Sequence, residues 1–63
     1  MKEYKIKYTL LVFQGLFKKI KEIDGVEIIE AKSHLDAQKK MEIIMKESKI
    51  EGIATVVNDI ILI

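Results

Sequence analysis

The stretch SHLDAQKKMEIIMKES, residues 33–48, decides the fold because its apolar side chains follow a helical period. Spacings of three and four residues form one apolar stripe, made of Ala37, Met41, Ile44 and Met45. Ser33 and Asp36 resemble the start of a capping box, with Asp in place of the usual Glu or Gln. The pattern therefore predicts an amphipathic helix over residues 34–48.

Segments with the composition of β-strands flank this helix. Residues 26–32 before it and residues 53–63 after it are rich in β-branched side chains, which favour pleated structure. Asn58 and Asp59 interrupt the second segment, which is either two strands joined by a tight turn or one bent strand. In residues 3–12, polar side chains alternate with Tyr4, Ile6, Tyr8 and Leu10. This period of two predicts a strand with one buried face.

Residues 13–23 allow two interpretations. Apolar side chains again recur at spacings of three and four, and Gly25 stands where a glycine often ends a helix. The alternative is a β-hairpin that turns at Gln14-Gly15 or Asp24-Gly25. As a strand, however, this segment would place Ile23 on one face with lysines. We therefore favour a helix over residues 13–23.

Together these elements predict one small domain, residues 1–63, of the α+β or α/β class. The expected order is β-α-β-α-β, with a C-terminal hairpin if residues 53–63 form two strands. Two helices would then pack on one face of a three- or four-stranded sheet, as a two-layer sandwich.

The composition excludes several classes of protein. The chain has 63 residues, 49% of them hydrophobic, no Cys, and a net charge of +1. Without Cys it forms neither a disulfide framework nor a thiolate zinc site. No apolar run is long enough for a membrane span and no export signal is visible, so we expect a cytoplasmic location and no membrane partner.

Candidate catalytic groups are few. His34 is the only histidine, and its neighbour Ser33 would not face it in a helix. Asp24 and Glu51 each precede a glycine, and we expect both to be solvated at helix–strand junctions. The glycines lack the spacing of a phosphate-binding loop. We therefore expect no enzymatic activity, no cofactor and no metal site.

Small size combined with many apolar residues favours self-association. A domain of about 60 residues buries only about 60% of its unfolded surface, and such domains often depend on disulfides, metals or oligomerisation. We predict a homodimer whose contact is the C-terminal run Ile60, Ile61, Leu62 and Ile63, because this run lacks the charges that usually protect a sheet edge. Replacing Ile61 with Lys should then yield a monomer or a misfolded chain.

The function predicted from the sequence is a non-enzymatic protein-interaction or regulatory module that acts as a homo-oligomer. One alternative is a nucleic-acid-binding protein that uses the lysine-rich faces formed by Lys5, Lys7, Lys18, Lys19 and Lys21. Tyr4 and Tyr8 could then stack on bases, although core packing explains them more simply. A second alternative is a small-ligand sensor at a subunit interface. The small size and the Lys- and Ile-rich composition are also compatible with an accessory protein of a phage, virus or plasmid.

Overall fold

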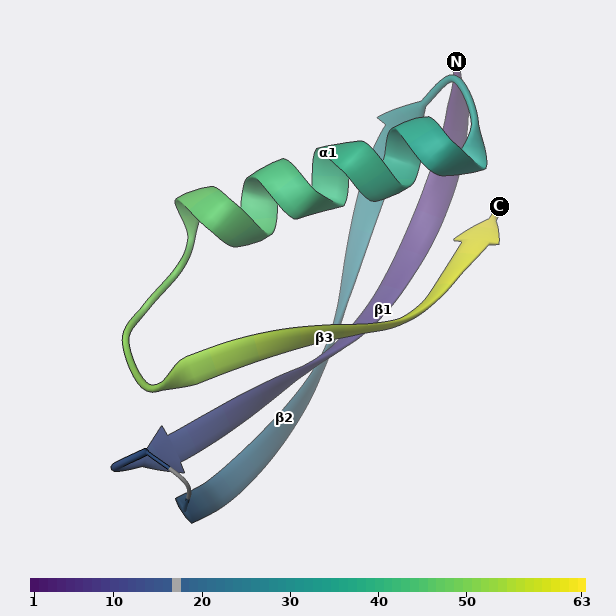
Figure 1. Cartoon of the computed structure of the whole chain (residues 1–63). Coiled ribbons are helices and arrows are strands. Elements are labelled where there is room, and N and C mark those ends of the chain that lie inside the picture. Colours follow the sequence, from purple (N-terminus) through teal and green to yellow (C-terminus); the bar gives the residue numbers. More distant parts are fainter. Residues whose placement is uncertain (17) are drawn as a thin grey trace.

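The computed structural model describes residues 1–16 and 18–63 and has the order β-β-α-β (Figure 1). Its elements are β1 (Lys2–Gln14), β2 (Lys18–Ala31), α1 (His34–Glu47) and β3 (Ile53–Leu62). The strands form one sheet in the order β2-β1-β3, and β1 is antiparallel to both neighbours. The central strand is therefore β1, and β2 and β3 are edge strands that run in the same direction.

The expected order β-α-β-α-β, with two helices on the sheet, is wrong. Residues 13–23 do not form a helix: they contain the end of β1, a turn and the first part of β2. The turn includes Gly15 at φ +74°, a conformation that suits glycine, so the hairpin at Gln14-Gly15 is correct. Phe17, which the predicted helix contained, lies outside the described residues.

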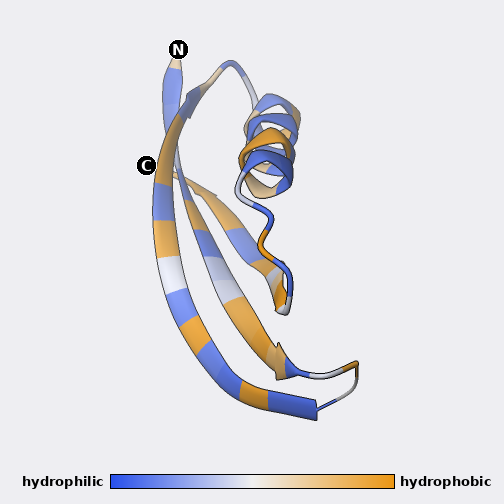
Figure 2. Ribbon diagram, turned by 90° about the vertical axis from the view of Figure 1, so that its left-hand side faces the viewer, coloured by the Kyte–Doolittle hydropathy of each residue, from blue (hydrophilic) through white to orange (hydrophobic). Residues whose placement is uncertain are grey.

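The helix was preferred because a strand would place Ile23 on the same face as lysines, and the structure contains that arrangement. Ile23 does share a sheet face with Lys21, since they pair with Leu10 and Val12 on β1. The distal hairpin, residues 10–14 and 18–23, extends beyond α1, so lysines on that face stay in solvent (Figure 2). A strand whose end is not covered therefore needs no uniformly apolar face.

The predicted second helix is confirmed as α1, which spans His34–Glu47. At its start the Ser33 hydroxyl accepts a hydrogen bond from the Asp36 N–H at 3.2 Å. The Asp36 carboxylate in turn accepts the backbone N–H of Lys32 at 2.9 Å. These reciprocal bonds fix the angle at which the chain leaves β2 and enters the helix.

The core lies between α1 and one face of the sheet, near the N-terminal end of β1. Six apolar side chains are buried there: Tyr4, Ile6, Ile29, Ala31, Ala37 and Met41. A helix of this length spans about 21 Å, whereas the longest dimension of the molecule is 41 Å. The helix therefore covers only about half of the sheet (Figure 2).

The C-terminal segment is one strand, β3, and not a hairpin. Its register with β1 shifts between Lys7 and Tyr8, which pair with Asp59 and Val57 and leave Asn58 as the extra residue. This irregularity corresponds to the bend that the Asn58-Asp59 pair suggested. Gly52, at φ +84°, ends the loop before β3.

Candidate interaction surface

The face of the sheet opposite α1, which we call the open face, is the largest candidate surface. Side chains alternate along a strand, so the odd-numbered residues of β1 and their partners lie on this face. Within the described residues, no helix or loop packs against it. The open face runs the length of the molecule and is three strands wide (Figure 1).

Four large apolar side chains of the open face are strongly exposed. Val26 and Ile28 on β2 are 49% and 51% exposed. Val56 and Ile61 on β3 are 43% and 37% exposed. Strand pairing places Val26 and Ile28 on one side of the central strand and Val56 and Ile61 on the other, with polar side chains of β1 between the two pairs. The open face therefore combines exposed apolar and polar groups.

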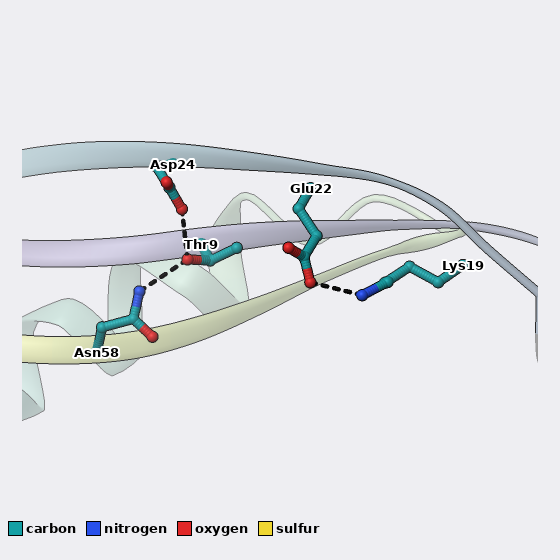
Figure 3. A network of polar contacts seen from close by, with 5 residues as sticks. All are labelled: Thr9, Lys19, Glu22, Asp24 and Asn58. Atoms are coloured by element: carbon teal, nitrogen blue, oxygen red, sulfur yellow. Dashed lines mark hydrogen bonds and ion pairs between the residues drawn. The ribbon is translucent and has the colours of Figure 1, made fainter.

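A chain of hydrogen bonds crosses the middle of the open face and joins all three strands (Figure 3). The Thr9 hydroxyl donates to Asp24 Oδ1 at 2.8 Å and accepts from Asn58 Nδ2 at 2.7 Å. Further along β2, Lys19 Nζ lies 2.6 Å from Glu22 Oε1. The polar groups of Thr9 are thus satisfied within the chain, which lowers the cost of covering this part of the face.

The helix side of the sheet contains a groove of about 290 Å³ beneath the C-terminal half of α1. Its walls are mainly apolar, and the side chains of Tyr8, Leu10, Met41, Ile44 and Ile53 line it. Met41 is buried and Met45 is half-buried, so both complete the packing between helix and sheet. The groove is the place where the small core ends and the distal hairpin begins.

The four residues predicted as the dimer contact do not share one environment. Ile60 packs against the core residues Tyr4 and Ile6. Ile61 pairs with Lys5 and lies on the open face, whereas Leu62 pairs with Tyr4 on the helix side. Ile63 follows the strand and donates its N–H to the carbonyl of Glu3.

The structure does not bring the predicted nucleic-acid residues together. Lys5 and Lys7 lie on the open face, whereas Tyr4 and Tyr8 lie on the helix side, so no Tyr–Lys stacking platform forms. Tyr4 is 5% exposed and belongs to the core. The remaining three, Lys18, Lys19 and Lys21, lie at the far end of β2.

The candidate catalytic residues are also separated. The His34 ring meets the Tyr4 ring edge to face, with centroids 6.3 Å apart. Asp24 lies in the middle of β2 and Glu51 in the turn before β3, so the expectation that both occupy helix–strand junctions is wrong for Asp24. Among residues 1–16 and 18–63 no group of three or more His, Cys, Asp or Glu side chains is placed to bind a metal.

The contacts of the Asp36 carboxyl group lower its pKa. The hydrogen bond from the Lys32 backbone N–H lowers the pKa of the Asp36 carboxyl, and partial desolvation opposes this effect. Lys40 Nζ, at 3.6 Å, lowers the pKa further. The carboxylate therefore belongs to the helix cap and not to a catalytic group.

Sequence reasoning missed the residues that dominate the open face. The sequence predicts Val26 and Ile28 in a strand, but nothing in their local pattern indicates which face of that strand a helix covers. The signal was the apolar content on both faces of residues 26–29, which a strand covered on only one side does not require.

Comparison of the chain with protein-family models, with curated proteins and with solved structures finds no match. In the part of the chain that the structure describes, no helix has the length and apolar character that crossing a membrane would require.

Proposed function

We propose that this chain is a non-enzymatic interaction module that acts as a homo-oligomer. The observation that supports it most is the imbalance between its core and its surface. Of the described residues, only six apolar side chains are buried, whereas thirteen large apolar side chains are exposed. Association with a second copy would remove part of this surface from water and so stabilise the fold.

The distal hairpin strengthens this argument. Leu10 and Val12 on its helix side and Leu11 and Phe13 on its other side are only half-buried. Ile23, on β2, is 42% exposed. A hairpin with apolar residues on both faces gains little stability alone in water, because neither face is packed against another layer. A binding partner would supply the missing layer.

Sedimentation velocity and native mass spectrometry test the proposal. We expect a species of twice the 7.3 kDa chain mass to dominate at concentrations of about 100 µM and to dissociate on dilution. Circular dichroism at each concentration would show whether folding and association are linked. A folded chain that stays monomeric over the whole range would refute the proposal.

A further inference from the structure

We propose that the open face is the self-association surface and that a second copy of this chain packs on it face to face, with its strands running antiparallel. This inference rests on the homo-oligomer proposed above and specifies its contact. It differs from the contact expected from the sequence, in which the edge formed by residues 60–63 pairs with a partner.

Both edges of the sheet are protected against strand addition. On β3 the Ile60 N–H is bound by Asp59 Oδ1 at 2.9 Å, and the Ile53 N–H is bound by the Ile50 carbonyl at 3.1 Å. The irregularity at Asn58 further interrupts this edge. On β2, seven of fourteen residues are charged. Bulges and charges of this kind are how sheet edges avoid pairing with other chains.

The charges of the open face are self-complementary along its length. From the N-terminal end of β1 they are, in order, Glu3 with Glu30, then Lys5 and Lys7 with Asp59, then Asp24 with Glu22, and finally Lys19. Asp59, the partner of Lys7 on β3, leaves the second block with a net positive charge, so the net sign of the blocks alternates from negative to positive twice. Consider a twofold axis that lies between the two sheets, perpendicular to the strands, at the level between Lys7 and Thr9. It would place each charged block of one copy opposite a block of opposite net charge in the other copy. Such a pattern favours one antiparallel alignment of the two copies.

Exposed apolar side chains lie beside the charged ones within these blocks. Ile28 on β2 and Ile61 on β3 are the two cross-strand partners of Lys5, and Val56 on β3 is a partner of Thr9. Thr9 itself is close to the proposed axis, and its hydroxyl is already satisfied by Asp24 and Asn58. Covering this network therefore leaves no new unpaired polar group at Thr9, and the network can fix the register of the two sheets.

The size of the open face is sufficient for a small specific dimer. The face extends along the 41 Å axis of the molecule, and three strands at about 4.8 Å spacing make it about 14 Å wide. Two such faces would together bury on the order of 1,200 Å², the lower end of the range for specific interfaces. The proposed contact thus predicts a dimer that dissociates on dilution.

Variants on opposite faces test this contact. Ile28→Glu places a negative charge in the open face, opposite the block of Asp24 and Glu22, and on a strand that an edge contact through β3 would not involve. We expect it to weaken dimerisation at least about tenfold. Ile43→Glu is the matched control, since Ile43 is 56% exposed on α1 and Ile28 is 51% exposed on β2. We expect Ile43→Glu to leave the dimerisation constant unchanged.

Two adjacent residues of β3 give a second comparison. Ile61 lies on the open face and Leu62 on the helix side of the same edge strand. Ile61→Lys should dissociate the dimer and Leu62→Lys should not, with sedimentation velocity as the readout and circular dichroism as the check on folding. Equal loss in both variants together with an intact Ile28→Glu dimer would show edge pairing and overturn the inference, while self-association itself would stand. A monomeric wild-type chain would overturn both proposals.

Discussion

The ring of Tyr8 occupies the space above Gly25, its cross-strand partner, where any other residue would carry a side chain. A Cβ atom at Gly25 would overlap the Cζ, Oη and Cε2 atoms of the tyrosine. Gly25 has no positive φ, so its backbone conformation does not demand glycine. The requirement for glycine here comes from the aromatic ring, which covers the edge strand where it lacks a side chain.

Gly25→Ala should therefore destabilise the chain by about 1–3 kcal/mol, because the added methyl group displaces the Tyr8 ring from its packing. Urea denaturation measures the effect. In the double variant Tyr8→Ala/Gly25→Ala the space is free, so the cost of the alanine should disappear. Additive effects of the two substitutions would contradict the steric relationship.

Ile6→Ala should remove more stability than any truncation on the surface. Among the described residues Ile6 is the largest fully buried side chain, and it joins β1 to Ile29 and Met41. Deleting it should cost about 2–5 kcal/mol, from lost burial and from the cavity that remains. Ile43→Ala, at an exposed position of α1, is the control and should change the free energy of unfolding by less than about 0.5 kcal/mol.

Ser33→Ala tests the helix cap. The hydroxyl of Ser33 accepts the Asp36 N–H, which has no partner within the helix. Its loss should destabilise the chain by about 1 kcal/mol. Ser33→Asp retains an acceptor at the cap and should restore most of that stability. If Ser33→Ala and Ser33→Asp unfold at the same urea concentration, the cap contributes nothing.

Asp36 should make stability fall in acid. Its folded-state pKa lies below the ordinary value of 3.8, so its contribution is present in full above that pH. As the pH falls from 3.8 through the folded pKa, the unfolded chain binds the proton first and the contribution is lost. Wild type should thus exceed Asp36→Asn in stability near neutral pH, and the difference should shrink below 3.8. A difference that stays constant would refute this linkage.

Local signals in the sequence were sufficient to predict α1 and its cap. The apolar stripe and Ser33 act through contacts within a few residues, so they do not depend on the rest of the fold. The pair of Asp36 and Lys40, one helical turn apart and 3.6 Å from each other, is local in the same sense. The strands predicted at residues 3–12 and 53–63 correspond to β1 and β3, but their pattern does not indicate which strands pair.

The long hairpin could not be predicted from the same signals. Its apolar residues follow spacings that fit a helix, and the choice of strand depends on pairing with β1, which is a contact between distant residues. The environment of Gly25 shows the same limit: its sequence context resembles a turn, whereas its structural role depends on Tyr8. The open face could not be predicted either, because the period of two in a strand does not indicate which face of the sheet a single helix covers.

The alternation of charge along the open face predicts a dependence of dimerisation on charge and salt. Lys5→Glu changes the net charge of the block of Lys5, Lys7 and Asp59 from positive to negative and sets a glutamate against the block of Asp24 and Glu22 in the proposed alignment. We expect it to weaken dimerisation about tenfold at low salt. The loss should be smaller near 1 M salt, where charges more than about 3 Å apart are largely screened.

Lys39→Glu is the control for this substitution, because it makes the same change in net charge at an exposed position of α1. Sedimentation velocity at two salt concentrations would separate an effect of net charge from one of position. If Lys5→Glu and Lys39→Glu weaken dimerisation equally, the antiparallel alignment of charged blocks is wrong. A loss confined to Lys5→Glu and reduced by salt would support it, because screening acts on the cross-interface pairs and leaves the apolar contacts of Ile28 and Ile61 intact.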